Sequence, residues 1–322
     1  MPDLRSTGVK IASLAHCLPE RAATNKAIID EHAIRLNPEW VRLNIGIEER
    51  RWASDGETPA TLAADVLRQL LQGRVAGEDS IGALIVSTVS SEWMTPAVAC
   101  VVQSMVTPGA VYPCFDITAA CSGFVYALDI GRRYVQTGVP SVACIATEIR
   151  SRSLNKQDRR TVMLFGDGAA GAVLEPCQPG EVGIIYSRTM ADGRYWDAIA
   201  VPVGGHITMK EATFIFSTAI QEMAQLVRGA LEACGMTIDG IDQFIFHQAS
   251  GVIVDKVAEH LAIPPEKYYK NFQTRGNMTS ASVAVALSEA VSAGRIRRHD
   301  HVCLVATGGG FSAGIVILRW EC

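Results

Sequence analysis

The sequence predicts a large layered α/β protein built from two halves of similar size. Its 322 residues are about twice a typical domain of roughly 150 residues. Short apolar runs alternate along the chain with longer amphipathic stretches, a pattern typical of strands separated by helices. Near the midpoint, residues 175–181 read EPCQPGE, a turn-rich segment. We take this segment as the boundary between two domains, 1–176 and 177–322.

Expected strands are continuous apolar runs, which are typical of strands covered on both faces. Expected helices show helical periodicity, and Gly138, Gly235 and Gly294 follow three of them as left-handed stops. The strands are residues 83–89, 111–117, 141–146, 161–165, 170–174, 243–246, 301–306 and 314–318. The helices are residues 59–71, 95–106, 122–137, 217–233, 251–261 and 280–293.

Composition excludes several classes of protein. Hydrophobic residues make up 48% of the chain and charged residues 19%, so a substantial core is expected. The net charge of −4 argues against a nucleic-acid partner. Apolar runs are far shorter than the ~20 residues of a membrane-spanning helix, so no membrane partner is expected.

The cysteines and histidines indicate the compartment and the metal content. Nine cysteines are scattered without a CxxC pair, and MPDLRSTGVK at the start shows no secretory leader. We therefore expect reduced thiols and a cytoplasmic location. The histidines do not pair with cysteines or carboxylates at ligand spacing, so no metal site is expected.

A glycine run resembles a dinucleotide-binding motif by its letters. Gly166, Gly168 and Gly171 in GDGAAG fit G-x-G-x-x-G. That motif needs a following helix to meet the pyrophosphate, whereas AVLEP follows here. We interpret the run as strand, tight turn and strand, and expect no nicotinamide or flavin cofactor.

Cys121 is the most informative cysteine because it follows the apolar run YPCFDITAA and precedes an amphipathic stretch. A thiol at a helix N-terminus meets free backbone N–H groups and the positive end of the helix dipole, so its pKa should fall. The small neighbours Ala119, Ala120, Ser122 and Gly123 would let a substrate approach. The alternative is that Cys121 is a small core residue.

Three further features also fall at the ends of predicted elements. His247 closes the strand IDQFIF, Asn277 lies in the turn RGNMTSAS, and TGGGFSAG follows a strand near the C-terminus. Consecutive glycines expose backbone N–H groups that could stabilise an oxyanion. Each feature alone could be structural, as a core histidine, a turn asparagine or a tight turn. Together they supply a thiol nucleophile, two neutral hydrogen-bonding groups and a set of amide donors.

Longer segments around these residues resemble β-ketoacyl-acyl-carrier-protein synthase III, a family of condensing enzymes. The resemblance spans nearly the whole chain. It implies a thiolase-like α/β fold of two similar halves in α-β-α-β-α layers, assembled as a homodimer. The segments that carry it are DITAACSGFVYAL, DRRTVMLFGDGAAGAVL, FIFHQAS, RGNMTSASVAVALSEAV, ATGGGFSAGIVILRW and, near the start, ATNKAIIDEH and EWVRLNIGIEERRWA.

The resemblance implies a Cys-His-Asn site and an acyltransferase activity. Cys121 would accept an acyl group from an acyl-CoA as a thioester. His247 and Asn277 would bind the carbonyl of malonyl-acyl-carrier-protein (malonyl-ACP) and stabilise the enolate that forms when CO2 leaves. The N–H groups of Cys121 and Gly309 would form the oxyanion hole, and Phe124 matches the aromatic residue after the cysteine. No cofactor is implied beyond the coenzyme A (CoA) thioesters themselves.

The same resemblance indicates a CoA site and some departures from the family. Trp40 and Arg159 match residues on either side of the CoA adenine, and Ser250 stands where an asparagine usually binds the pantetheine arm. Thr95 replaces a phenylalanine that closes the neighbouring subunit's acyl pocket, so longer or bulkier donors than acetyl are expected. Asn44, Arg160 and Val252 also differ from the family pattern.

These departures keep several alternatives open. One is a specialised-metabolism enzyme with a longer or unusual acyl donor, and another is acyl transfer without decarboxylation, although keeping both His247 and Asn277 argues against it. A papain-like hydrolase has the same Cys-His-Asn order along the chain. Such hydrolases need a C-G-S-C-W type context around the cysteine, whereas this chain has A-A-C-S-G-F. A non-catalytic subunit would be expected to lack the nucleophile. The sequence leaves the natural donor, the malonyl carrier and the pathway open.

Overall fold

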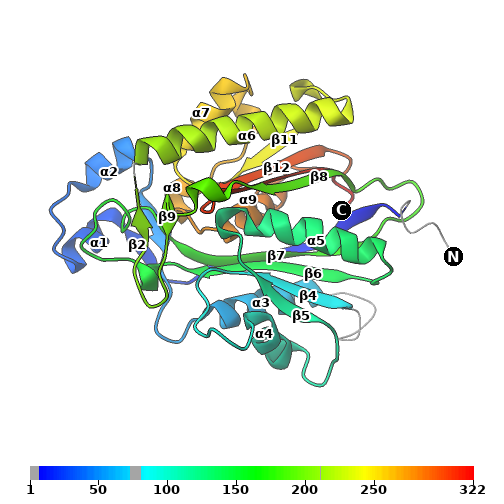
Figure 1. Ribbon diagram of the computed structural model, residues 1–322, viewed down its shortest axis with the longest axis horizontal. Helices are drawn as coiled ribbons and strands as arrows, with labels where there is room; N and C mark the ends of the chain where they lie inside the picture. Colours follow the sequence, from blue (N-terminus) through cyan, green and yellow to red (C-terminus); the bar gives the residue numbers. More distant parts are fainter. Residues whose placement is uncertain (1–6, 73–80, 211) are drawn as a thin grey trace.

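Five layers of helices and sheets make up the molecule (Figure 1). The computed structural model describes residues 7–72, 81–210 and 212–322. Two mixed sheets enclose a central layer formed by α5 (Gly123–Gln136) and α9 (Ala281–Ser292). The outer layers are α3 (Pro59–Leu71) and α4 (Val98–Val106) against the first sheet, and α6 (Ala212–Cys234) and α7 (Gly251–His260) beside the second. The expected α-β-α-β-α arrangement is confirmed.

The first sheet has the strand order β1-β7-β6-β4-β5. β4 runs parallel to both of its neighbours, whereas β7 is antiparallel to β6 and to β1. All residues of β4 and β6 are buried because helices cover both faces. The strands are β1 (Val9–Cys17), β4 (Ala83–Ser87), β5 (Cys114–Ile117), β6 (Val142–Ile149) and β7 (Asp167–Pro176).

The second sheet repeats this order and these strand directions. Its order, β8-β13-β12-β11, continues beyond β11 through a parallel bridge between Phe244 and Tyr268. β11 is parallel to β12, and β13 is antiparallel to β12 and β8. The strands are β8 (Ile184–Ala191), β11 (Gln243–Phe246), β12 (His301–Gly308) and β13 (Ser312–Arg319). The chain is therefore built from two similar halves, and we keep 1–176 and 177–322 as their proposed limits.

The helices follow the same repeat. α4 follows β4 as α7 follows β11, and α5 precedes β6 as α9 precedes β12. α5 and α9 are therefore equivalent, and both lie buried between the sheets. Their N-termini adjoin each other, because a Cβ atom built on Gly123 would lie 3.2 Å from Ser280 Cβ and 1.9 Å from Ser87 Oγ. Only glycine at this position lets the start of α5 pack so closely.

A smaller set of elements lies beside the two halves. It comprises a short antiparallel pair, β2 (Ala22–Thr24) with β3 (Glu49–Arg51), and the helices α1 (Asn25–Glu31) and α2 (Pro38–Asn44). A second short pair, β9 (Ile199–Ala200) with β10 (Thr208–Met209), forms a hairpin. The four-residue helix α8 (Phe272–Arg275) precedes α9, and short 3-10 turns complete the connections.

All six expected helices are present, and the stops at Gly138, Gly235 and Gly294 are confirmed by positive φ angles of 103°, 65° and 68°. The expected strand 161–165 is wrong. Residues 161–164 form turns and only Phe165 makes an isolated bridge, while Val162 and Met163 are apolar because they pack into the small core beside α1. β1 and β8 were not expected from the sequence.

The glycine run GDGAAG is not followed by a helix, as expected, but the expected tight turn within it is wrong. β7 runs without interruption from Asp167 to Pro176. A Cβ on Gly168 would lie 2.8 Å from Leu18 Cδ2, and one on Gly171 would lie 2.8 Å from Cys144 O. The glycines therefore allow close packing against neighbouring chain segments, and they form no phosphate-binding loop.

Candidate active site

One large cavity opens where strands of both halves end. Its volume is about 1400 Å³, and its wall includes residues that follow β4, β5, β6 and β11. The carboxyl ends of strands are the usual ligand-binding edge of α/β sheets. The β9–β10 hairpin, residues 199–209, and the start of α7 complete the wall. This cavity therefore collects loops from both halves of the fold.

Cys121 lies in this wall, in a 3-10 turn formed by Ala120–Ser122 directly before α5 begins. A pair of hydroxyl groups holds the turn in place. Ser122 Oγ lies 2.7 Å from both Ala119 O and Ser312 Oγ, and Ser312 Oγ donates to Ala119 O at 3.0 Å. The turn that carries the thiol is thus tied to the start of β13.

The glycine loop at the end of β12 packs directly against Cys121. A Cβ atom on Gly308 would lie 2.6 Å from Cys121 N and 3.2 Å from Ser122 N. Gly309 and Gly310 line the cavity beside the thiol. The absence of side chains here brings backbone amides from two segments to one corner of the cavity.

The pKa of Cys121 does not fall as the sequence analysis expected. Burial raises the pKa of its thiol to about 12, the nearby Glu148 carboxylate also raises it, and Arg150 partly opposes the rise. Desolvation penalises the thiolate more than the start of α5 stabilises it. Cys121 therefore rests as a thiol.

Asn277 also lines the cavity, and its amide is held in one orientation. Its Oδ1 accepts a hydrogen bond from Thr279 N at 2.8 Å, and its backbone pairs with Leu164 O and Gly166 N. Because Oδ1 is engaged, Nδ2 is the free end of the amide. Within residues 7–72, 81–210 and 212–322, Nδ2 donates to no protein group. Asn277 can therefore offer a neutral donor to a ligand.

His247 follows β11 and is only 2% exposed. Its backbone N donates to Val305 O at 2.8 Å, and its Nδ1 has no hydrogen-bond partner in the described part of the chain. Burial lowers the pKa of its imidazole to about 3, so the ring is neutral at physiological pH. His247 itself is not among the residues of the cavity wall, whereas Ala249 and Ser250, two and three residues later, belong to it.

A buried carboxylate that the sequence analysis missed connects these segments. Glu148, at the end of β6, accepts hydrogen bonds from Ser90 Oγ at 2.8 Å and Ser280 Oγ at 2.7 Å. It therefore joins the loop after β4 to the start of α9, three residues beyond Asn277. A charged residue inside the otherwise apolar strand VACIATEI is the sequence signal that could have revealed it.

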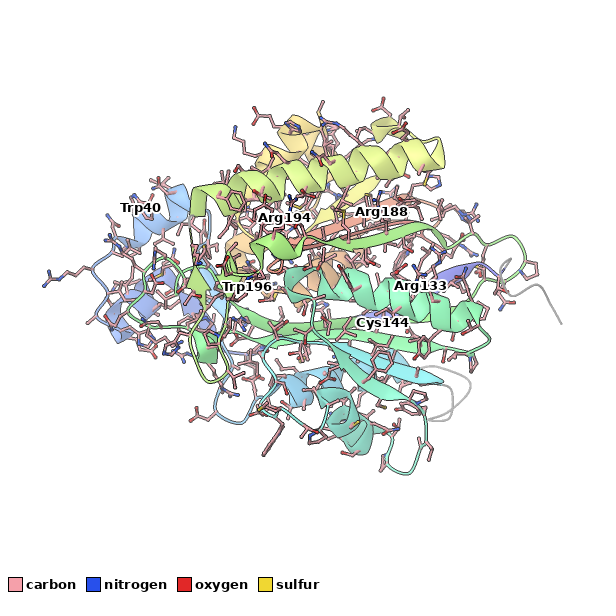
Figure 2. All side chains as sticks on the ribbon, viewed as in Figure 1. Trp40, Arg133, Cys144, Arg188, Arg194 and Trp196 are labelled. Atoms are coloured by element: carbon pink, nitrogen blue, oxygen red, sulfur yellow. The ribbon has the colours of Figure 1, made fainter. Side chains whose placement is uncertain are left out.

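Four expected binding residues lie outside this wall. Trp40 is 50% exposed on α2 at the periphery of the molecule (Figure 2), and Arg159 is exposed in a turn. Thr95 follows Trp93 and Met94, which do line the cavity. Phe124 is fully buried in the central core, so its expected place in substrate binding is corrected to packing within α5.

Ser250 and Gly309 do lie in the cavity wall, as does the β9–β10 hairpin, which sequence analysis did not detect. Ser250 Oγ accepts from Ile253 N at 3.4 Å and so caps α7. The hairpin strands have only two residues each, too short for a periodic signal. Residues on one side of the cavity were therefore predicted from the sequence, whereas the hairpin on the other side was not.

Comparison with known proteins decides the family. A family model described as 3-oxoacyl-[acyl-carrier-protein] synthase III matches residues 115–193, and its C-terminal counterpart matches residues 231–320. The β-ketoacyl-[acyl-carrier-protein] synthase III of Desulfotalea psychrophila is 35% identical over 97% of this chain and 99% of its own. The chain belongs to the β-ketoacyl-acyl-carrier-protein synthase III family. It is therefore a condensing acyltransferase.

Solved structures agree with this family assignment. The synthase III of Aquifex aeolicus has a TM-score of 0.92 and 34% identity, over 97% of this chain and 100% of its own. The priming β-ketosynthase of the R1128 polyketide biosynthetic pathway has a TM-score of 0.90 and 26% identity, over 98% of this chain and 96% of its own. The thiolase-like fold expected from the sequence is confirmed.

Gly308→Ala tests the packing of the glycine loop. The added Cβ would lie 2.6 Å from Cys121 N, so either the loop or the Cys121 turn must move. We expect the condensation rate of this synthase III family member to fall by about 10²-fold, the usual cost of losing an oxyanion donor. A steady-state assay measures it, and circular dichroism separates it from unfolding. Gly229→Ala, on exposed α6 with open space around the new Cβ, is the matched control.

Proposed function

We propose that this chain loads an acyl group from an acyl-CoA onto Cys121 and condenses it with malonyl-ACP to a β-ketoacyl product. The observation that carries the proposal is the shared cavity. It holds the Cys121 thiol, the free Nδ2 of Asn277 and the glycine loop that contacts the Cys121 amide. A nucleophile, a neutral donor and backbone amides are the groups that thioester exchange and condensation need.

In the loading step, Cys121 Sγ attacks the acyl-CoA carbonyl. The new C–S bond replaces the bond to CoA, and the thiol proton leaves on the CoA thiol, so the exchange is balanced. Because the pKa of Cys121 is raised to about 12, deprotonation is coupled to attack. The N–H groups of Cys121 and Gly309 would hold the tetrahedral oxyanion.

In the condensation step, the malonyl thioester carbonyl accepts hydrogen bonds from His247 and Asn277. Loss of CO2 leaves an enolate, which two neutral donors stabilise. The enolate carbon then attacks the acyl thioester, the C–S bond to Cys121 breaks, and the released thiolate takes a proton from water. The lowered pKa of His247, about 3, keeps the imidazole neutral and suited to this role.

CoA would enter beside α2 and α7. Ser250, in the wall, would meet the pantetheine arm, and Trp40 and Arg159 would flank the adenine outside the cavity. We also propose a cytoplasmic homodimer, with Thr95 in the exposed segment that would reach the neighbouring acyl pocket. No helix among the described residues is long and apolar enough to cross a membrane. No cofactor besides the thioester substrates enters this proposal.

The test follows acyl loading and CO2 release on wild-type protein. Intact-protein mass spectrometry with a panel of acyl-CoAs should show one acyl adduct. Carboxyl-labelled malonyl-ACP should then release one CO2 for each β-ketoacyl product. Acyl transfer without CO2 release would establish the non-decarboxylating alternative. Loading confined to long or unusual donors would favour a specialised pathway, and absence of any adduct would contradict acyl-CoA as the donor.

A further inference from the structure

An arginine is buried in the wall of the Cys121 cavity. Arg150 follows β6 directly, is only 2% exposed and ranks with Arg50 among the largest fully buried side chains of the described chain. It lines the cavity, and its charge acts on the Cys121 thiol. A guanidinium carries five N–H donors and stays charged in proteins, so burying one without acceptors is costly.

The protein provides Arg150 with few acceptors. Its Nη1 donates to Val89 O at a long 3.4 Å, and its guanidinium lies 5.9 Å from the centre of the Phe165 ring. Its Nε is buried without a hydrogen-bond partner in the described part of the chain. The Nε of Arg50, which is also fully buried, lacks a partner too, but the Nη atoms of Arg50 donate to Ala23 O, Asn25 Oδ1 and Met163 O. The two buried arginines therefore differ in how much of their hydrogen-bonding capacity the protein uses.

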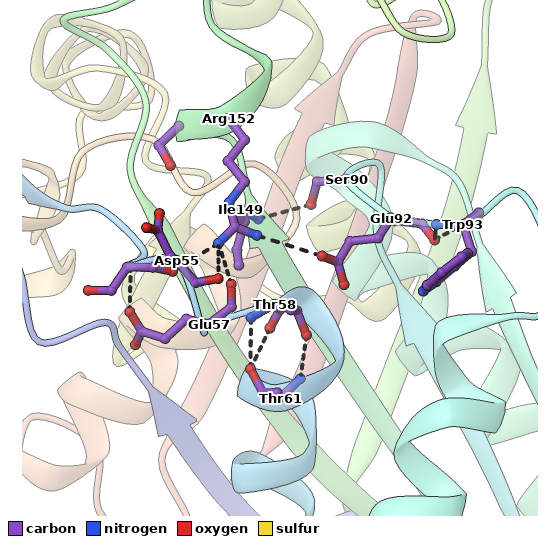
Figure 3. Close-up of polar contacts among 12 residues, drawn as sticks. Asp55, Glu57, Thr58, Thr61, Ser90, Glu92, Trp93, Ile149 and Arg152 are labelled. Carbon is purple, nitrogen blue, oxygen red and sulfur yellow. Dashed lines mark hydrogen bonds and ion pairs between the residues drawn. The ribbon is translucent and has the colours of Figure 1, made fainter.

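The neighbouring arginine in the same wall, Arg152, also has more partners than Arg150. Arg152 Nη2 donates to the carbonyls of Ser54 and Glu57 at 2.9 and 2.6 Å, and Nη1 lies 3.8 Å from a Glu92 oxygen (Figure 3). Arg152 thus ties the turn before α3 to the loop after β4. Arg150, two residues earlier, has no comparable structural task.

Glu148 lies near Arg150 but does not occupy its donors. Its carboxylate is taken by Ser90, Ser280 and Val89 N, and no ion pair within 4.0 Å joins it to Arg150 among the described residues. Burial raises the pKa of Glu148, and the charge of Arg150 opposes that rise. The cation therefore remains available to an acceptor that enters the cavity.

We propose that Arg150 binds a carboxylate at the far end of the acyl group, so that the preferred donors are CoA thioesters of short dicarboxylic acids. The inference rests on the proposed function, because it specifies the donor that Cys121 takes up. A guanidinium fork matches a carboxylate in a bidentate pair, which is strong in a desolvated site. The malonyl carboxylate is the poorer occupant. It must leave as CO2, and an ion pair that stabilises it would oppose that loss.

The test compares matched donors that differ only in the terminal group: succinyl-CoA with butyryl-CoA, and glutaryl-CoA with pentanoyl-CoA. Wild type should load the dicarboxylic member of one pair at least about 10-fold faster. Arg150→Met should reverse that preference by lowering dicarboxylic loading about 10²-fold, whereas Arg150→Lys keeps part of it. Loading rates come from intact-protein mass spectrometry. Arg152→Met is the matched control and should change both members of a pair alike.

A binding measurement keeps the inference separable from the proposed function and from any folding defect. In a Cys121→Ala background, calorimetry should show tighter binding of the dicarboxylic thioester, and this difference should vanish with Arg150→Met. Equal or tighter binding of the neutral thioesters in both pairs would overturn the inference, whether or not loading occurs. Loading of neutral donors alone would also overturn it while leaving the proposed function intact. If Arg150→Met changed only the KM for malonyl-ACP, Arg150 would bind the malonyl carboxylate. That result would overturn the proposal that Arg150 binds the acyl donor.

Discussion

Cys121→Ala should abolish acyl loading and lower β-ketoacyl formation by at least about 10⁴-fold, the usual cost of removing a covalent nucleophile. Cys121 lies in the cavity wall, at the start of a central helix, against the glycine loop. Intact-protein mass spectrometry with a reactive acyl-CoA measures loading, and product formation from malonyl-ACP measures condensation. Release of CO2 without condensation should persist, because His247 and Asn277 remain.

The other cysteines supply the controls. Cys100→Ala changes an exposed thiol outside the cavity wall and should leave loading unchanged. Cys144 and Cys303 are fully buried in the two sheets, and burial raises their pKa values well above the ordinary thiol range. An adduct that survives in Cys121→Ala and maps to another cysteine would contradict the assigned nucleophile.

Much of the layered fold could be predicted because burial on both faces leaves a strong local signal. The helix Pro59–Leu71 and the strand Gln243–Phe246 have the bounds expected from their apolar patterns. Thr161–Phe165 shows the limit of that signal, since an apolar run packs equally well as a turn against a small core. Strands such as Ile184–Ala191, with one partly exposed face, were missed for lack of a continuous run.

In the site, too, features set by the local sequence could be predicted, whereas features that depend on distant segments could not. Cys121, Asn277 and Gly309 were predicted because each terminates an element, and the carboxyl edge of the sheets brings them to one cavity. The pKa of Cys121 was predicted in the wrong direction, because desolvation depends on segments far away in sequence. Arg150 was missed because the sequence does not show which acceptors surround a side chain. Its small number of hydrogen bonds becomes clear only in the structure, by comparison with the hydrogen bonds of Arg152 and Arg50.

The repeated architecture explains why both halves contribute residues to the cavity that holds Cys121. α5 and α9 are equivalent helices, and a residue with positive φ precedes each: Ala120 at 45° and Thr279 at 51°. At each of these two residues the chain leaves the cavity wall and turns into the helix of the central layer. One bend adjoins Cys121 and the other holds the Asn277 amide through Thr279 N. An internal repeat therefore supplies the proposed nucleophile from one half and a neutral donor from the other.

His247→Ala should lower the rate of malonyl decarboxylation by about 10²- to 10³-fold while leaving acyl loading much less affected. One of the two donors to the enolate oxygen is lost, and water replaces it poorly in a buried site. The measurement is single-turnover CO2 release from carboxyl-labelled malonyl-ACP on protein that has already been acylated. His247→Asn, which restores a neutral donor, should recover part of the rate. Asn277→Ala should match His247→Ala, and the double variant should cost little more, because both groups act on one atom.

The pH profile distinguishes a neutral imidazole from a charged one. Burial lowers the pKa of His247 to about 3, against about 6.5 when the chain is unfolded. The folded protein therefore keeps the ring neutral above about pH 3, and decarboxylation at saturating malonyl-ACP should show no titration near 6.5. Between pH 6.5 and 3 the unfolded chain binds the proton first, so stability should fall as the pH drops and His247→Gln should flatten that slope. A rate that declines as the pH rises through 6.5, and a loss of that decline in His247→Gln, would instead mean that the imidazolium is the active form.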